Sequence, residues 1–216
     1  MQKRIAMDTL KIPYFKALNF DTPTILSERL IASGSRIKID QVNWDEFRHR
    51  PDVWVYTGHC DQKLWLHYIV LNDFVRAVCT TDQEPVWQDS CVEFFLKQGD
   101  IYRNFEFNCL GVCLSAFGAD RQSRQSLDAH SMEQIVRFSS LKPDHLPSGD
   151  NASDWTLTVG IPLDLIGLSS GSLFMANFYK CGDNTKLPHY LSWNAISTSS
   201  PDFHRPEFFS PVELMK

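Results

Sequence analysis

The chain has 216 residues, a formal net charge of −5 and a sequence pI of about 5.8. Hydrophobic residues make up 43% of it and charged residues 22%, which is ordinary for a soluble globular protein and argues against extended disorder. The acidic balance provides no general attraction to the phosphates of nucleic acid or of anionic lipid. The longest apolar stretch, residues 64–71, is far shorter than the roughly 20 residues that cross a bilayer, so we expect no membrane span.

Short segments with strand character follow one another along the chain, since they alternate in polarity and are rich in β-branched or aromatic residues. They are residues 36–40, 63–71, 74–79, 91–97, 101–109, 112–117, 134–139, 155–161 and 173–181. Helical candidates are brief: residues 44–49 after Asn43 as a cap, and residues 163–166 after Pro162. The pattern predicts an all-β fold, an antiparallel β-sandwich of jelly-roll or immunoglobulin-like type with a few short helices.

The domain organisation is expected to be simple. No internal repeat and no Pro-rich or Gly/Ser-rich linker divides the chain, which predicts a single domain over residues 1–216. Residues 1–30 would form an N-terminal extension that packs on the sandwich. The polar segments 120–130 and 143–153 are expected to be long loops, where function often resides.

One hairpin can be predicted in register, because Gly99-Asp100 is a good two-residue turn between two strand segments. Counting outward from the turn places residues of one face in opposite pairs: Val92 with Phe107, Phe94 with Phe105, and Leu96 with Arg103. The other face pairs Cys91 with Asn108, Glu93 with Glu106, and Phe95 with Asn104. Two glutamates directly opposite each other repel unless a cation, an arginine or a shared proton neutralises them, or unless they splay apart into solvent.

The six cysteines are dispersed and form no CxxC pair, so we expect reduced and mostly buried thiols. The interrupted apolar pattern of residues 1–15 is not that of a secretion signal. Both observations favour a cytoplasmic protein.

The segment Val-Trp-Gln-Asp-Ser-Cys-Val-Glu-Phe-Phe, residues 86–95, resembles the family 9 carbohydrate-binding modules, in which a tryptophan precedes an Asp-Ser pair and a Val-Glu strand. Further segments join the resemblance, which extends over roughly residues 30–214. They are residues 102–108, 155–163, 177–181, 190–194 and 201–209.

This resemblance implies a β-sandwich that binds sugar without acting on it, and in some members structural calcium. The sugar would lie between the rings of Trp87 and Trp193, since the C–H faces of a pyranose pack on aromatic rings while its hydroxyls need hydrogen bonds. The implied hydrogen-bonding residues are Glu93, which follows Trp87 by six positions, and Glu106, Asn108 and Asn177, which depend on the predicted register. Family members are often joined to glycoside hydrolases, so the resemblance implies a mono- or oligosaccharide of the glucose or xylose type and a link to carbohydrate catabolism.

Other chemistries stay open. Glu93 and Glu106 are the carboxylate pair that a weak glycoside hydrolase would need. A zinc site could draw on late residues of the types that bind zinc, and a heme- or protein-binding sandwich is a further alternative. The zinc candidates are Cys181, Asp183, His189 and His204, and the axial heme candidates are Met132, Met175, His189 and His204. The sequence names no calcium ligands, because no EF-hand-like loop is present.

Overall fold

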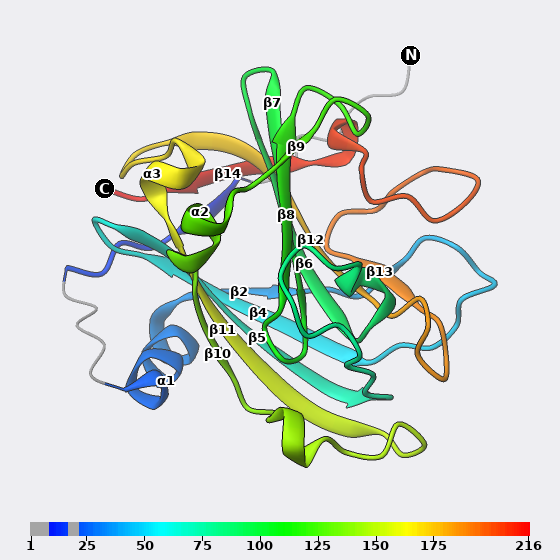
Figure 1. Cartoon of the computed structure of the whole chain (residues 1–216). Helices are drawn as coiled ribbons and strands as arrows, with labels where there is room; N and C mark the ends of the chain where they lie inside the picture. The colour runs from blue at the N-terminus through cyan, green and yellow to red at the C-terminus, as the bar shows by residue number, and fades with distance from the viewer. Residues whose placement is uncertain (1–8, 17–21) are drawn as a thin grey trace.

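The computed structural model describes residues 9–16 and 22–216, which form two β-sheets packed face to face (Figure 1). Within the described residues, the larger sheet has nine strands and the smaller has five. The larger contains β1 (Leu10–Ile12), β3 (Gln41–Val42), β6 (Cys91–Gln98), β7 (Ile101–Asn108), β8 (Cys113–Gly118), β9 (Gln125–Ser126), β12 (Leu173–Cys181), β13 (Tyr190–Ser192) and β14 (Ser210–Leu214). The smaller contains β2 (Ser35–Lys38), β4 (Asp52–His59), β5 (Lys63–Asp73), β10 (Val136–Ser139) and β11 (Ser153–Pro162). The predicted all-β sandwich is confirmed.

The strand order of the larger sheet is β1-β14-β12-β6-β7-β8-β9, with β13 bridging β12 and β3, and that of the smaller is β10-β11-β5-β4-β2. β1 and β14 are parallel, and the other strands pair in antiparallel fashion. The helices are short: α1 (Pro23–Ser33), α2 (Ala129–Glu133), α3 (Leu163–Ile166), and the 3-10 turns η1 (Val86–Gln88), η2 (Pro143–His145) and η3 (Pro206–Phe208). In the described part of the chain, no helix is long and apolar enough to cross a membrane.

The main core fills the space between the two sheets, because every second residue of the central strands points inward. β5 and β11 supply aliphatic and aromatic side chains from the smaller sheet, and β6, β7 and β12 supply mainly phenylalanine from the larger. Phe94 of β6, for example, stacks on Phe178 of β12 with ring centroids 5.0 Å apart. The alternate residues of β6, β7 and β12 therefore lie on the outer face of the larger sheet, and this face is the one that carries the cavity described below.

The register predicted for the β6–β7 hairpin is confirmed at every position. Glu93 is the partner of Glu106, and Phe94 is the partner of Phe105. Gly99 adopts a φ of 60°, the left-handed conformation that a two-residue hairpin turn requires and that glycine tolerates without steric cost.

The strand predicted over residues 74–79 is wrong, although the other predicted strands are confirmed to within a few residues at their ends. In place of a neighbouring strand, the backbone N–H groups of this segment bond to two side chains. Arg76 donates to Ser90 Oγ at 3.1 Å, and Val78 and Cys79 donate to Asp89 Oδ2 at 3.0 and 2.9 Å. The segment is therefore fastened to the turn that contains Asp89 and Ser90 and does not join either sheet.

The helix predicted over residues 44–49 is also wrong, because its expected cap is committed elsewhere. The Asn43 amide donates to Ser192 Oγ at 2.9 Å and accepts from the Ile196 N–H at 2.8 Å, which ties the segment to the loop after β13. A single turn remains, closed by the Phe47 N–H on the Trp44 carbonyl. The short helix predicted after Pro162 is confirmed as α3.

Helix α1 lies outside the five-stranded sheet (Figure 1) and was not predicted. Thr22 caps it by accepting the Ile25 N–H, Pro23 occupies its first turn, and Leu26 and Leu30 bury one face against Trp65. The N-terminal extension expected over residues 1–30 falls only partly within the described residues. The parts that are described contact the sandwich through α1 and through the pairing of β1 with β14.

Acid is expected to destabilise the fold through His67, which lies on the α1 side of β5. Burial lowers the pKa of His67 to about 4, and its Nδ1 lies 2.7 Å from Thr158 Oγ1. Because the folded-state pKa is below the unfolded value, stability falls as the pH drops below about 6.5, and the loss of about 3 kcal/mol is complete near pH 4. Urea unfolding of a His67→Gln variant should show a correspondingly smaller loss across this range. An unchanged pH dependence would assign the loss to other histidines, such as His189 and His204, whose pKa values burial also lowers.

Candidate functional site

A cavity of about 200 Å³ opens on the outer face of the nine-stranded sheet, away from the sandwich core. Its floor comes from three adjacent strands, with Glu93 on β6, Glu106 on β7 and Cys181 on β12. Leu114 of β8, Tyr190 of β13, Trp87 of the turn η1 and several loop residues supply the remaining walls. The full lining is Trp87, Glu93, Glu106, Leu114, Arg121, Arg124, Cys181, Asp183, Tyr190, Pro201, Asp202, Phe203 and His204.

Trp87 lies at the mouth of the cavity, in the turn η1, with 38% of its surface exposed. Its neighbour Val86 is fully buried and anchors the turn. The fully buried carboxylate of Asp89 ends the turn by pairing with Arg76 and by accepting from Asn108 Nδ2 at 3.0 Å. The turn is thus held by residues beside Trp87, which leaves the indole ring available to a ligand.

Glu93 and Glu106 are both 3% exposed and lie side by side as the hairpin register predicts. Burial raises the pKa of Glu93 well above its usual value, and the Cys181 thiol donates to its Oε1 at 3.1 Å. Burial also raises the pKa of Glu106, to about 7, although Arg124 and the Asn104 amide oppose the shift. Asn104 Nδ2 donates to Glu106 Oε1 at 3.0 Å. Protonation of Glu93 and the nearby guanidinium therefore relieve the repulsion between the two carboxylates.

Arg124 and His204 form one wall of the cavity together. Arg124 Nη1 donates to Asn104 Oδ1 at 2.7 Å and lies 3.4 Å from His204 Nδ1. Burial and the two neighbouring arginines, Arg121 and Arg124, lower the pKa of His204 to about 3. The imidazole is consequently neutral, so its Nδ1 can accept from Arg124 or from the Tyr102 hydroxyl at 3.3 Å. This wall presents hydrogen-bond donors to the cavity.

Asp183 and Tyr190 line the cavity on the side of β12 and β13. Burial raises the pKa of Asp183 to about 6, and a hydrogen bond links its carboxyl to Tyr190. The Tyr190 ring is held edge-on against Phe47 at 4.7 Å. The cavity therefore combines aromatic rings, carboxyl groups and guanidinium groups within a single volume.

Of the six ligand-binding residues predicted from the sequence, Trp87, Glu93 and Glu106 line the cavity, while Asn108, Asn177 and Trp193 do not. Asn108 supports the turn below Trp87 through Asp89, and Asn177 accepts the Asn194 N–H at 2.9 Å. The Trp193 ring packs against Phe178 of the main core at 5.7 Å. The structure therefore does not bring the two predicted tryptophan rings together across this cavity.

Sequence reasoning predicted no sugar contact for seven further lining residues, of which it named Asp183 and His204 only as zinc candidates. They are Arg121, Arg124, Asp183, Tyr190 at the start of β13, Asp202, Phe203 and His204. Weak signals existed, since the two arginines lie in the polar segment expected to be a functional loop and residues 201–204 begin one of the segments that carry the family resemblance. Neither signal could place these residues beside β6 and β7.

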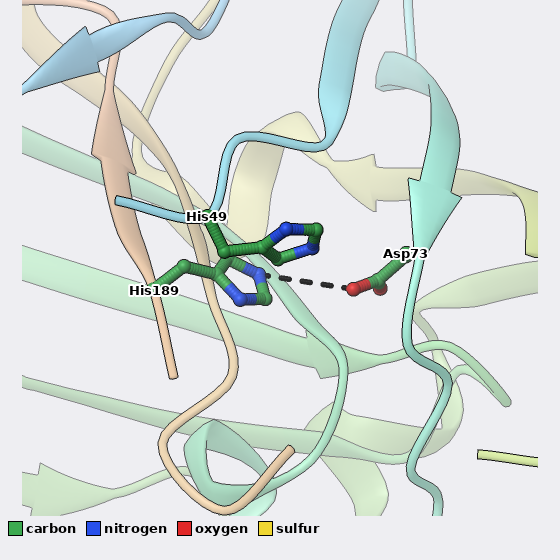
Figure 2. Close-up of side chains that lie close together, drawn as sticks. All are labelled: His49, Asp73 and His189. Carbon is green, nitrogen blue, oxygen red and sulfur yellow. Dashed lines mark ion pairs between the residues drawn. The ribbon is translucent and has the colours of Figure 1, made fainter. Parts of the chain in front are cut away.

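A second cluster of titratable side chains lies away from the cavity, where the His49 and His189 imidazoles face the Asp73 carboxylate (Figure 2). One potential ligand atom from each residue lies within 4.8 Å of the others. Lys180, however, already places its ammonium here, 3.1 Å from Asp73 Oδ2 and 2.8 Å from His189 Nε2. This cluster is a buried ion-pair network in which a lysine occupies the position that a metal ion would need.

The zinc candidates divide between the cavity and the Lys180 network, and the heme candidates are dispersed. Of the zinc candidates, Cys181, Asp183 and His204 line the cavity, while His189 belongs to the Lys180 network. Met132 is buried in the main core, and Met175 packs against a separate apolar cluster on the outer face of the larger sheet, which includes Phe95 and Tyr179. Calcium stays a prediction from the resemblance, because each described group of three clustered His, Cys, Asp or Glu ligands includes imidazole or thiol rather than oxygen alone.

The β-sandwich and the aromatic, hydrogen-bonding cavity on its outer sheet face are the features of a ligand-binding module. The family model of Carbohydrate-binding family 9 matches residues 22–214. The chain belongs to this family, as the sequence resemblance predicted. No curated protein sequence is significantly similar to it.

Several solved structures are similar to the chain, among them the following three. A candidate carbohydrate-binding protein from Bacteroides uniformis has 31% identity and a TM-score of 0.86, with 95% of this chain and 98% of that chain covered. A family 9 module from Caldicellulosiruptor kristjanssonii in complex with cellotriose has 11% identity and a TM-score of 0.61, covering 96% and 94%. The same organism's family 9 module in complex with glucose has 10% identity and a TM-score of 0.55, covering 97% and 96%. The last two similarities, at 11% and 10% identity, show a shared fold alone.

Proposed function

We propose that this protein binds a neutral mono- or oligosaccharide in the cavity bordered by Trp87 and does not alter it chemically. The observation that carries the proposal is the meeting of a partly exposed indole ring with buried carboxyl groups and with the guanidinium groups of Arg121 and Arg124 in one small volume. A sugar needs both, because its C–H face packs on an aromatic ring and its hydroxyls must exchange water for protein hydrogen bonds. A link to carbohydrate catabolism belongs to the same proposal and is supported by family membership.

The size of the cavity favours one sugar ring, such as a glucose or xylose unit at the end of a chain. Its volume of about 200 Å³ is below the roughly 300–1,000 Å³ of sites for larger ligands. Stacking would come from Trp87, with Tyr190 and Phe203 as further aromatic walls in place of Trp193. Glu106 and Asp183 would accept hydroxyl hydrogen bonds, and Arg121 and Arg124 would donate them.

Recognition without hydrolysis is supported by the two floor carboxyls. A glycosidase needs one protonated and one ionised carboxyl, so their environments must push the two pKa values apart. Here burial raises the pKa of both Glu93 and Glu106. Both shifts favour the protonated form, and Glu106, with a pKa of about 7, is only about half ionised at neutral pH, so neither carboxyl is held fully ionised as a nucleophile.

The test is isothermal titration of the protein with glucose, xylose, cellobiose and xylobiose, with and without calcium, while the same mixtures are analysed for hydrolysis products. We expect saturable heat with a Kd between about 1 μM and about 1 mM, and no products. Arg124→Ala should weaken binding while Arg48→Ala, an exposed arginine outside the cavity lining, should not. Absence of heat with every sugar would refute the proposal, and product formation would replace it with the hydrolase alternative.

A further inference from the structure

The floor of the cavity contains a pair of thiols as well as carboxyls. Cys91 of β6 lies directly opposite Cys181 of β12, and Glu93 points to the same face two residues along β6. All three side chains are buried, and one ligand atom from each lies within 4.8 Å of the others. Glu93 Oε1 is 3.1 Å from Cys181 Sγ and 4.0 Å from Cys91 Sγ.

From this geometry we infer that Cys91, Glu93 and Cys181 form a binding site for a thiophilic divalent cation such as Zn²⁺ or Cd²⁺. Two sulfurs and one oxygen are a donor set suited to such ions. With Zn–S near 2.3 Å and Zn–O near 2.0 Å, ligand atoms around a tetrahedral ion are about 3.5–3.8 Å apart. The two observed sulfur–oxygen separations, 3.1 and 4.0 Å, lie on either side of the expected value, and the two sulfurs lie within 4.8 Å of each other, so an ion needs only small side-chain shifts. The site goes beyond sugar binding and does not depend on it.

Metal binding at this floor would be coupled to proton release. Burial raises the pKa of Glu93 and of both thiols, with that of Cys91 rising to about 12, so in the free protein these buried acids are held in their neutral forms. Binding M²⁺ would convert two thiols and one carboxylic acid into ligands and release three protons to solvent.

The Lys180 ammonium, which occupies the Asp73 cluster, does not reach the floor of the cavity. Lys180 lies between Cys181 and Tyr179 in the chain, but its ammonium points to the opposite face of β12 and pairs with Asp73. Cys181 Sγ instead contacts the Trp87 carbonyl at 3.6 Å as well as Glu93. Because Glu93 and Cys181 line the cavity, the fourth coordination position would face the cavity and be filled by water.

The proposal is tested by titrating the reduced full-length protein with Cd²⁺ alone and recording the thiolate-to-cadmium charge-transfer absorption. We expect one ion per chain, an unchanged titration in excess Ca²⁺, and Zn²⁺ affinity, measured by competition with a chromogenic chelator, that falls about 100-fold or more in Cys91→Ser and Cys181→Ser. Cys60→Ser is the matched control, because this half-buried thiol lies outside the cluster and its loss should change nothing.

A second readout protects the test if a serine variant fails to fold. In the wild-type protein, the cadmium NMR shift should report two sulfur ligands, and Co²⁺ should give the visible spectrum of a tetrahedral thiolate site. The proposal is overturned by any of three results: no charge-transfer band, a band that survives both serine substitutions in folded protein, or a band lost in Cys60→Ser. A disulfide between Cys91 and Cys181 that persists in reductant would overturn it as well, since it would consume both ligands.

Discussion

Replacing Asp73 by alanine is expected to lower the free energy of unfolding by about 3–5 kcal/mol, because it leaves a buried ammonium group without its carboxylate partner. Asp73 and Lys180 are both fully buried, and their charged atoms are 3.1 Å apart. Without the carboxylate, the Lys180 ammonium keeps only the Cys181 carbonyl and the His189 ring, at 2.8 Å each, and no anion. The alanine also removes the acceptor of the Trp155 indole N–H, which bonds to Asp73 Oδ2 at 2.9 Å. Urea unfolding monitored by tryptophan fluorescence measures the change.

Removing Lys180 instead of Asp73 should lower the free energy of unfolding by less. In Lys180→Met, the remaining Asp73 carboxylate can pair with a protonated His189, whose Nε2 lies 3.8 Å from Asp73 Oδ1 (Figure 2). In Asp73→Asn combined with Lys180→Met, the charges are gone and the amide still accepts from Trp155, so stability should recover toward that of the wild type. Equal losses in Asp73→Ala, Lys180→Met and the double variant would show that packing, and not the buried ion pair, controls stability here.

Local signals account for the parts of the fold that the sequence predicted well. The Gly99-Asp100 turn defined the register of its hairpin, because a two-residue loop leaves no freedom to slip. β4 was missed because Trp54 and Tyr56 on its outer face hide the alternation with Val53 and Val55. α1 carries a readable Thr22-Pro23 start, but its short amphipathic pattern is weak beside the strand signals around it.

The candidate site likewise contains residues that the sequence could place and residues that it could not. Glu93 and Glu106 could be paired from the hairpin alone, whereas Arg124 reaches His204 across 80 residues through loops that follow no period. Trp87 and Trp193 both stand beside polar residues in the sequence. Their roles differ because the backbone N–H of Trp193 donates to the Phe178 carbonyl and the Trp193 ring packs on the core. Both contacts depend on the completed sheet.

Trp87→Ala is expected to weaken sugar binding by about 30-fold or more, equivalent to about 2 kcal/mol, which would place a weak ligand beyond detection. The loss follows from removing the stacking ring at the cavity mouth. Stability should change by less than about 1 kcal/mol, because the ring is 38% exposed and the turn is anchored by Val86 and Asp89 instead. Titration calorimetry and a thermal melt of the same sample measure both quantities.

Trp54→Ala is the matched control for this prediction. Trp54 is another partly exposed tryptophan, but it lies on β4 of the smaller sheet, where Arg36 and Lys38 pack over its ring at 4.4 and 5.1 Å. Its removal should leave the sugar affinity unchanged and should change stability about as little as Trp87→Ala does. Binding that survives in Trp87→Ala would place the sugar elsewhere on the molecule. If Trp87→Ala loses both sugar binding and cooperative unfolding, the ring is instead part of the core. The cavity would then have to recognise its ligand through the floor carboxyls and the wall formed by Arg124 and His204.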